Sequence, residues 1–561
     1  MMYNIGTTMM MKRYIHILVA LGAVFCTFGA NAQERVYVST DKECYIAGEP
    51  IWFSVYCMAD DKGGFSSVSK VAYLELHTSG GVFSTVKVAL KEGRGCGRML
   101  IPLTVPTGNC SIVSYTGLDG GNSTEAFAGK IITIFNTLSS AKVPEGVEIV
   151  PSDLPVKGDG VPQVGSNVFS VDVQKDDTGI EGAFPVSIRN LSDKGIRFSV
   201  SIYHNDELNS LVGEWGYNNT SLLERRGGFS RSGRIDYAGE VIKAKITGRD
   251  NAAEQMDGKL VYMSAMGNTD DIYVASANGN GVVTFYTNNI YGTRDLVFEV
   301  VGDTSKAYDV EILKPDHIHK SVPVPVLKIS PKMREALLQR STDMQIARRF
   351  EADTLFNLME MRETSFIGNV QPHIYNLDDY TRFPVMEEVI REYVKDLRVR
   401  KEGGETVLRI LWDTRAKALV LLDGVPVLDH SAVVGMDPLL VRQIAVYPRR
   451  YVLNNLVYDG IVKFNTYKND MGGIKLGRNV SIETHKGVEY PLAFLGDGVL
   501  GKENYPNFNS TIYWNPTAEI GAGETFGFYC AKPQYKGAFR MVIEGIDSQG
   551  KEVFFTTTFN L

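Results

Sequence analysis

The chain has 561 residues and a formal net charge of −7. Its composition, with 44% hydrophobic and 22% charged residues, is that of a folded protein and excludes wholesale disorder. The acidic balance excludes the basic footprint of a nucleic-acid-binding protein, and the length predicts about three to five domains.

Residues 1–32 have the organisation of a secretory signal peptide. Lys12 and Arg13 precede an apolar run, residues 15–28, and Ala30-Asn31-Ala32 forms an A-x-A cleavage site. The run is too short to cross about 30 Å of hydrocarbon as a helix. No later stretch reaches about 18 apolar residues, so we expect export without a later transmembrane segment. The expected location is the periplasm, or association with the outer membrane, of a Gram-negative bacterium.

Five cysteines follow this segment, and an odd number leaves at least one of them free or paired between chains. Export permits disulfides, so the four early thiols could form bridges. The alternative is that they are buried small apolar residues. The cysteines are Cys44, Cys57, Cys96, Cys110 and Cys530.

Short alternating strands between Gly, Pro and Asp residues predict an antiparallel β-sandwich over residues 34–137. Its opening, from Val36-Tyr37-Val38 through Tyr45-Ile46-Ala47-Gly48-Glu49 to Ile51-Trp52-Phe53, resembles the N-terminal domain of alpha-2-macroglobulin-type proteins. Gly95-Cys96-Gly97-Arg98-Met99 is similar to the thioester motif of that family. Arg98 and Met99 replace its Glu and Gln, so no thioester can form.

Two more strand-rich regions follow, at residues 160–238 and 239–313. The second, with Gly279-Asn280-Gly281 before Val283-Thr284-Phe285, resembles a carboxypeptidase-regulatory-like sandwich. Ser330-Pro331 predicts a helix start, because Ser suits the N-cap and Pro the first helical position. A second helix opens at Pro384, and its apolar stripe predicts packing on a sheet. The stripe is Met386, Val389, Ile390, Tyr393, Val394 and Leu397.

The region from 407 to 467 combines a doubly buried strand, Ala418-Leu419-Val420-Leu421-Leu422, with an Asp-Gly turn, a short helix and two more strands. This order resembles the plug domain of TonB-dependent outer-membrane receptors. The residues after Thr466 are too few for the receptor barrel of about 22 strands. We therefore expect a plug-like unit that docks another envelope component. The docking candidates are the residues of its two turns, expected to be exposed: Asp423, Gly424, Tyr458 and Asp459.

Patterns that resemble catalytic or ligand-binding motifs lack the surrounding structure or residues that such sites need. Gly496-Asp497-Gly498-Val499-Leu500-Gly501 is not followed by a helix, as a dinucleotide site requires. His317 and His319 lack further ligands for a metal. We expect no cofactor, no metal and no enzyme activity, although a catalytic triad assembled from distant residues stays open.

Together these features predict a mainly β, multidomain protein of successive antiparallel β-sandwiches with a small α+β plug-like domain. The whole resembles exported Bacteroidetes-type proteins of this domain content. The predicted function is a non-catalytic envelope scaffold or interaction protein with an outer-membrane partner. The alternatives are an accessory to TonB-dependent uptake and a protease-binding protein without thioester. Predicted domains are 1–32, 34–137, 160–238, 239–313, 326–470 and the C-terminal β segment 471–561.

Overall fold

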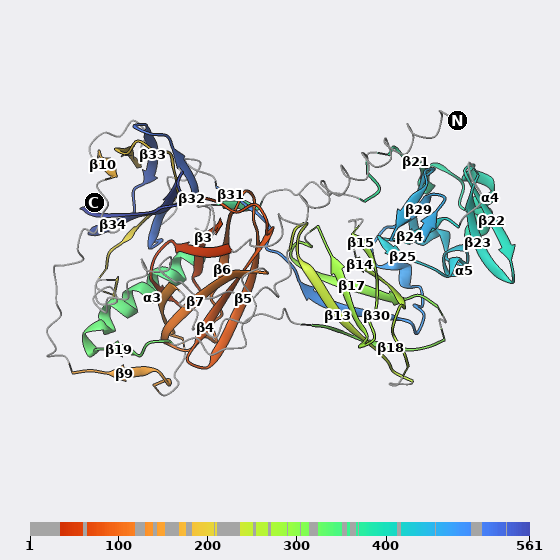
Figure 1. Ribbon diagram of the computed structural model, residues 1–561, viewed down its shortest axis with the longest axis horizontal. Helices are drawn as coiled ribbons and strands as arrows, with labels where there is room; N and C mark the ends of the chain where they lie inside the picture. Colours follow the sequence, from red (N-terminus) through yellow and green to blue (C-terminus); the bar gives the residue numbers. More distant parts are fainter. Residues whose placement is uncertain are drawn as a thin grey trace, which may run out of the picture. The chain divides into compact units, whose positions relative to one another are not determined.

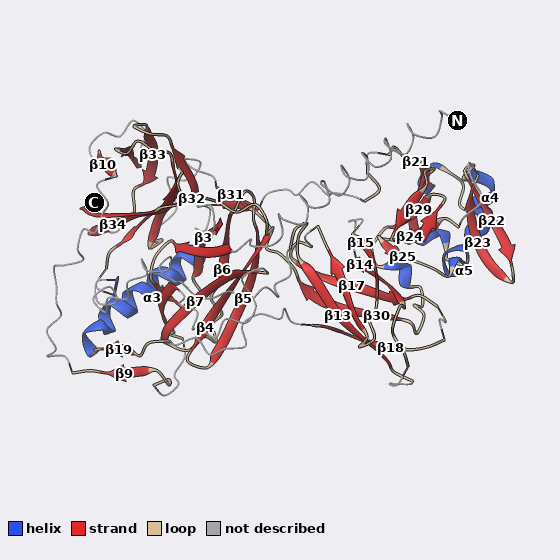
Figure 2. Cartoon of the chain, viewed as in Figure 1, coloured by secondary structure: helices blue, strands red, loops and turns tan. Residues whose placement is uncertain are grey.

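The structure, a computed structural model, is mainly β and multidomain, which confirms the predicted fold class (Figure 1, Figure 2). The chain divides into two compact units. Unit 1 comprises residues 1–237, 316–359 and 489–561, and unit 2 comprises residues 238–315 and 360–488. Within the described ranges, no helix has the length and apolar character needed to cross a membrane. The structure describes residues 34–59, 64–117, 130–138, 143–151, 168–174, 182–206, 208–209, 236–250, 254–266, 271–288, 290–302, 305–313, 324–349, 356–358, 366–368, 370–411, 417–454, 456–494, 508–534 and 536–561.

The first sandwich of unit 1 has sheets in the orders β1-β3-β6 and β2-β8-β7-β4-β5. Alternate residues of β3, such as Phe53 and Val55, enter the core between the sheets. On its opposite face Tyr56 contacts Ile546 of the second sandwich, so β3 is buried on both sides. The strands are β1 (Glu34–Thr40), β2 (Cys44–Ile46), β3 (Pro50–Ala59), β4 (Val71–Thr78), β5 (Gly81–Ala89), β6 (Arg94–Leu100), β7 (Gly108–Thr116) and β8 (Lys130–Phe135).

The second sandwich of unit 1 is built from two distant parts of the chain, with sheets in the orders β10-β11-β33 and β32-β12-β34-β35. Phe198 in β12 lies opposite Ala518 on one side and Gly545 on the other. The sequence assigns these strands to separate regions, 160–238 and 471–561, and in the structure they share sheets and a core. The strands are β10 (Phe169–Val173), β11 (Ala183–Asn190), β12 (Ile196–His204), β32 (Thr511–Ile520), β33 (Thr525–Ala531), β34 (Ala538–Asp547) and β35 (Glu552–Asn560).

A buried polar seam joins the two sandwiches of unit 1. The ammonium of Lys130 lies 3.2 Å from both carboxylate oxygens of Glu544, and both side chains are buried. Thr511 donates a hydrogen bond of 2.6 Å to Asp41. Burial raises the pKa of Asp41, and the neighbouring Lys42 ammonium opposes that shift. The seam therefore depends on partners that satisfy each other's charge and hydrogen bonds.

The helix predicted from Ser330-Pro331 packs on the first sandwich as α3 (Arg334–Arg349). Ser330 caps the preceding turn η2 (Pro331–Met333) by accepting from the Lys332 amide, as the sequence predicts. Met344 of α3 enters an apolar cluster with Cys44 and Ile46 of β2. The remaining strands of unit 1 are β9 (Val147–Ile149), β19 (Leu327–Ile329), β20 (Phe356–Leu358) and β31 (Leu492–Phe494).

Unit 2 begins with a third sandwich, whose sheets have the orders β16-β13-β18 and β15-β14-β17-β30. Phe285 and Phe298 meet in its core with ring centroids 6.0 Å apart. Strand β30 follows the α/β region in the sequence and pairs with β17. The sandwich is therefore complete only with a strand from beyond that region. The strands are β13 (Val241–Gly248), β14 (Leu260–Ala265), β15 (Ile272–Ser276), β16 (Val282–Tyr286), β17 (Thr293–Val300), β18 (Tyr308–Ile312) and β30 (Val480–Lys486).

The rest of unit 2 is an α/β region around a sheet in the order β21-β26-β29-β24-β25. The predicted apolar stripe is buried except for Tyr393, which is partly buried. The helix α4 ends at Tyr393, and Leu397 starts a hairpin strand instead of continuing the helix. Its elements are β21 (His373–Asn376), η3 (Leu377–Asp379), α4 (Met386–Tyr393), β22 (Leu397–Glu402), β23 (Glu405–Ile410), β24 (Leu419–Leu422), β25 (Val425–Pro426), α5 (His430–Val434), η4 (Pro438–Leu440), β26 (Val441–Tyr447), β27 (Tyr451–Leu453), β28 (Leu456–Tyr458), β29 (Ile461–Thr466) and η5 (Met471–Gly473).

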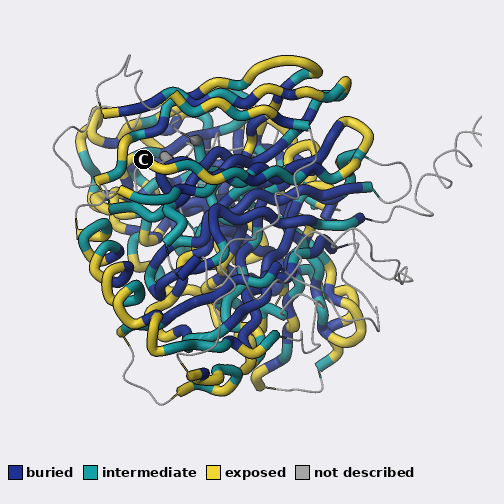
Figure 3. Tube along the Cα trace, turned by 90° about the vertical axis from the view of Figure 1, so that its left-hand side faces the viewer, coloured by how far each residue is buried: buried dark blue, intermediate teal, exposed yellow. Residues whose placement is uncertain are grey.

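Strand β24 is buried on both faces, as its continuous apolar sequence predicts. Figure 3 colours the buried segments of the chain dark blue. Val420 and Leu422 pack in the core with α4 and α5. Leu419 and Leu421 pack in a cluster that includes Tyr262 of the unit 2 sandwich. One face of this sheet is therefore covered by the chain's own sandwich.

Candidate interaction surface

The Asp-Gly turn after β24 is buried, whereas we expected it to be exposed. Asp423 is 2% exposed, and its carboxylate accepts hydrogen bonds from the Thr466 amide, the Thr466 hydroxyl and the Met471 amide at 2.6–2.8 Å. Gly424 has a φ of +83°, which suits a residue without a β-carbon. The carboxylate therefore ties the turn to the end of β29 and to η5.

The second predicted turn also faces inward. Asp459 is fully buried and accepts a hydrogen bond of 2.9 Å from Arg450. The hydroxyl of Tyr458 is hydrogen-bonded to that of Tyr262. Gly460 follows with a φ of +124°, and a β-carbon there would lie 2.3 Å from Ile410. These residues make internal contacts that fix the start of β29.

The structure does not bring the four predicted docking residues together. Strands β24 and β29 are parallel, so Asp423 and Gly424 follow the end of one strand while Tyr458 and Asp459 precede the start of the other. The two turns lie at opposite ends of the sheet. A docking role for these residues stays a prediction, and of the four only Tyr458 is partly exposed.

A different part of the α/β region presents exposed apolar side chains around a partly buried arginine. Arg382 donates to the carbonyls of Pro438 and Val441 at 2.7 and 2.9 Å. It also donates to Asp378 at 2.5 Å and to the Tyr467 hydroxyl at 2.8 Å. Four hydrogen bonds thus hold its guanidinium between η3, η4 and the end of β29.

Two leucines of η4 lie exposed beside this arginine. Leu439 is 62% exposed, Leu440 is 41% exposed, and Tyr467 is 48% exposed. The Tyr467 amide donates to the Leu440 carbonyl at 3.2 Å, which places the tyrosine next to the leucines. We call Asp378, Arg382, Leu439, Leu440 and Tyr467 the Arg382 surface.

The polar groups of the Arg382 surface are mutually ordered. The Tyr467 hydroxyl donates to Asp378 at 2.6 Å. This hydrogen bond, with that from Arg382, lowers the pKa of Asp378, and the same bond to Asp378 raises the pKa of Tyr467. The surface therefore keeps a fixed arrangement of charge around two exposed leucines at neutral pH.

Sequence reasoning missed this surface, although it identified Met436-Asp437-Pro438-Leu439-Leu440-Val441 as a short helix. Adjacent leucines in a helical turn normally suggest burial of at least one of them. The available signal was the Asp-Pro pair: the Asp437 side chain caps the turn by accepting from the Leu439 amide. A turn this short buries only Pro438, so the two leucines after it are left exposed.

A cavity of about 70 Å³ lies in unit 1, where α3 approaches the residues that flank β2, β12 and β32. Arg340 pairs with Asp206 at 3.0 Å, and Lys42 pairs with Glu49 at 3.4 Å. Because the charges within each pair neutralise each other, they do not favour the binding of a charged ligand. Burial raises the pKa of Asp343, which also borders the space. Side chains that line it include Glu49, His204, Asp206, Arg340, Asp343 and Ser510.

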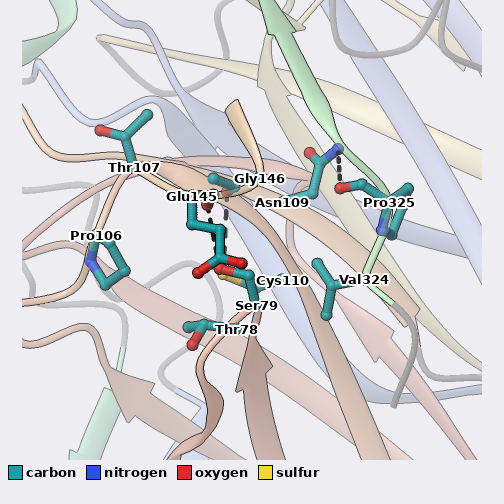
Figure 4. Close-up of a pocket in the computed structure, with 11 residues that line it drawn as sticks. Thr78, Ser79, Pro106, Thr107, Asn109, Cys110, Glu145, Gly146, Val324 and Pro325 are labelled. Atoms are coloured by element: carbon teal, nitrogen blue, oxygen red, sulfur yellow. Dashed lines mark hydrogen bonds between the residues drawn. The ribbon is translucent and has the colours of Figure 1, made fainter. Parts of the chain in front are cut away.

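A second pocket, shown in Figure 4, has a volume of about 10 Å³. That volume holds about one water molecule. Asn109 donates to the Pro325 carbonyl at 3.3 Å and Ser79 to the Glu145 carbonyl at 3.1 Å, as the dashed lines mark. The pocket is thus a gap between hydrogen-bonded segments, too small for a ligand larger than water.

All five cysteines after the predicted signal segment are described, and none forms a disulfide. Burial raises the thiol pKa to about 12 for Cys44 and Cys110 and to about 11 for Cys96. Such thiols are poor nucleophiles because little thiolate is present at neutral pH. Of the two alternatives from the sequence, the structure has unbridged thiols, four of them buried and that of Cys96 partly buried.

Three sequence features lie outside the described residues: the signal peptide at residues 1–32, the pair His317 and His319, and the glycine loop Gly496–Gly501. In the part of the chain that the structure describes, no group of three or more His, Cys, Asp or Glu side chains is placed to hold a metal ion.

Comparison with known proteins gives structural likeness only, since no family model and no curated protein matches the sequence. The chain is similar to the native conformation of E. coli alpha-2-macroglobulin, with 8% identity and a TM-score of 0.23, over 95% of this chain and 40% of that one. It is similar to Salmonella alpha-2-macroglobulin reacted with methylamine, with 9% identity and a TM-score of 0.22, over 95% and 40%. A tetra-tandem repeat from the extending region of a large adhesion protein has 7% identity and a TM-score of 0.12, over 95% and 99%. The chain spans about 40% of the length of the macroglobulins, and scores this low assign it neither a family nor a function.

Proposed function

We propose that this protein is exported to the cell envelope of a Gram-negative bacterium and acts there as a non-catalytic interaction protein that binds a partner protein. The support for export is the sequence of the first 32 residues, with Lys12 and Arg13 before a short apolar run and an A-x-A site. The resemblance of residues 407–467 to a plug domain supports a partner in the outer membrane.

The observation that carries the binding proposal is the Arg382 surface. Single exposed apolar residues are ordinary, but adjacent ones cost free energy in water and mark contact sites. The strongest contributors at protein interfaces are enriched in Tyr and Arg. Here Tyr467 and Arg382 are held in place before any partner arrives, which lowers the entropy cost of binding.

The distribution of exposed apolar side chains agrees with this assignment. Among the described residues, 22 large hydrophobic side chains are exposed, and ten of them lie in the α/β region between residues 374 and 476. That stretch is under a quarter of the described chain. For its length, the α/β region therefore exposes more large hydrophobic side chains than the rest of the described chain does.

The test is photo-cross-linking in the native host with p-benzoylphenylalanine in place of Leu439. The matched control places the same group at Leu338, which is 58% exposed on α3 of unit 1. We expect a discrete adduct in the envelope fraction from position 439 that disappears when Arg382→Ala is added. No adduct from position 439, or the same adducts from position 338, would refute the assignment of this surface.

Fractionation of the same cells tests export separately. Export predicts a chain that has lost its first 32 residues and sediments or elutes with envelope fractions. A full-length chain in the cytosol would overturn the localisation and leave the binding surface to be judged by cross-linking alone.

A further inference from the structure

The sandwich and the α/β region of unit 2 meet at a joint that contains a buried carboxyl group. Tyr262 on β14 packs in one cluster with Leu419 and Leu421 of β24. Val297 on β17 packs in the core of the α/β region. Glu299, two residues along β17 from Val297, points to the same side and is 8% exposed.

The groups facing Glu299 come from each element packed against it. Tyr262 lies directly opposite on β14, and its hydroxyl is bonded to that of Tyr458 on β28. Asp429, the N-cap of α5, adds a second negative charge nearby. Asn479, which immediately precedes β30, donates to Glu299 at 3.4 Å. None of these facing groups is a cation.

The amide of Asn479 supplies the complement that a protonated carboxyl needs. Its nitrogen donates to Glu299 and, at 2.9 Å, to the Val300 carbonyl. Its oxygen Oδ1 is buried and has no hydrogen-bond partner among the residues that the structure describes. A buried acceptor without a donor is costly, and a carboxylic acid next to the amide provides that donor.

The titration of Glu299 agrees with this geometry. Burial raises the pKa of Glu299 to about 7, the hydrogen bond from Asn479 opposes the shift, and Asp429 adds to it. Near neutral pH the carboxyl therefore exchanges its proton with water in the folded protein.

We propose that Glu299 and Asn479 form a proton-operated latch at the point where the chain returns from the α/β region to the sandwich. In the closed latch the protonated carboxyl donates to Asn479 Oδ1 while the amide nitrogen donates to the other carboxyl oxygen. When the proton leaves to bulk water, this hydrogen bond is lost and an anion remains buried beside Asp429. Strand β30 and the joint then open more readily.

The expected size of the effect follows from the two pKa values. A carboxyl with a pKa of about 7 when buried, and the ordinary 4.5 once β30 opens, favours the closed state most at low pH. Linkage then increases the opening equilibrium of β30 about 70-fold between pH 5 and pH 8. The latch therefore responds over the range from pH 5 to pH 8.

The test is hydrogen–deuterium exchange of β30 amides in the full chain from pH 5 to 8, corrected for intrinsic exchange rates. Glu299→Gln replaces the acid by an amide that pairs with Asn479 at every pH. Glu311→Gln, on the exposed face of β18 in the same sandwich, is the matched control. Each variant is compared with wild type at the same pH, so that the effects of other titrating groups on exchange cancel.

We expect the protection of β30 in Glu299→Gln, relative to wild type, to rise about 70-fold from pH 5 to 8, while Glu311→Gln follows wild type. A ratio for Glu299→Gln that stays constant within threefold would overturn the latch, as would an equal rise in Glu311→Gln. If Glu299→Gln does not fold, Asn479→Ala decides. Its loss of β30 protection must be larger at pH 5 than at pH 8, and an equal loss at both would refute the proposal.

Discussion

Removing one charge from the seam of unit 1 should destabilise the protein far more than removing a surface charge. Lys130 is 2% exposed, Glu544 is 4% exposed, and the ammonium lies 3.2 Å from both carboxylate oxygens. Lys130→Met leaves the carboxylate buried without its cation, which costs about 3–5 kcal/mol. For a unit of this size that corresponds to a fall in Tm of roughly 6–20 °C.

The double variant Lys130→Met/Glu544→Gln separates the loss of a partner from the loss of the pair. It removes both charges, and the Gln keeps an acceptor for the buried Tyr37 hydroxyl, which is hydrogen-bonded to Glu544. Replacing both members of a buried pair is often close to neutral, so we expect it to regain most of the stability lost in the single variant.

Guanidinium unfolding followed by tryptophan fluorescence measures these differences, because Trp52 and Trp514 are buried in unit 1. Lys551→Met is the control: Lys551 is exposed in the turn between β34 and β35 of unit 1, and the cost should stay within about 0.5 kcal/mol. The reasoning fails if Lys130→Met costs no more than Lys551→Met, or if the double variant is less stable than the single one.

Three further predictions concern unit 2, each measured as a change in unfolding free energy. Asp423→Ala should cost about 3 kcal/mol because three buried donors lose their acceptor, whereas Asp378→Ala, at 63% side-chain exposure, should leave the stability close to that of wild type. Gly460→Ala should cost about 3 kcal/mol because its β-carbon would meet a side chain at 2.3 Å and a carbonyl at 2.8 Å; Gly404→Ala, with a positive φ but open space, should cost only about 1 kcal/mol. Burial lowers the pKa of His430 from 6.5 to about 4, so its contribution is present above pH 6.5 and about 3 kcal/mol of it should be lost as the pH falls to 4. A His430→Asn variant that keeps the acid slope of wild type would contradict this last assignment.

Local patterns were sufficient to predict many elements but not their partners. The alternation in β3 and the stripe beginning at Met386 predict which side of each element is buried, because side-chain direction repeats every two or 3.6 residues. Alternation does not say which strand lies alongside. The sequence of β12 does not indicate that β32 and β34 will flank it, since backbone hydrogen bonds do not depend on which residues form them.

The same limit explains the candidate site. An Asp-Gly pair predicts a turn, and turns are usually exposed, which made Asp423 a reasonable docking candidate. Its burial depends on Thr466 and Met471, whose amides arrive from a distant part of the chain. By contrast, the exposed leucines of η4 look like core residues in the sequence. Burial is a tertiary property, so both assignments needed the structure.

The pH response of unit 2 combines two buried groups whose contributions have opposite signs. Glu299 holds a proton that the unfolded chain releases above about 4.5, so its contribution is lost as the pH rises through its folded pKa of about 7. His430 stays neutral in the folded protein down to about pH 4, whereas in the unfolded chain it is protonated below pH 6.5. Its contribution to stability is therefore lost as the pH falls toward 4. Between about pH 4.5 and 6.5 the two slopes nearly cancel, and a simple stability profile would look flat. The two contributions are seen only as the difference in stability between wild type and each single variant. Above pH 6.5 only the contribution of Glu299 still changes with pH.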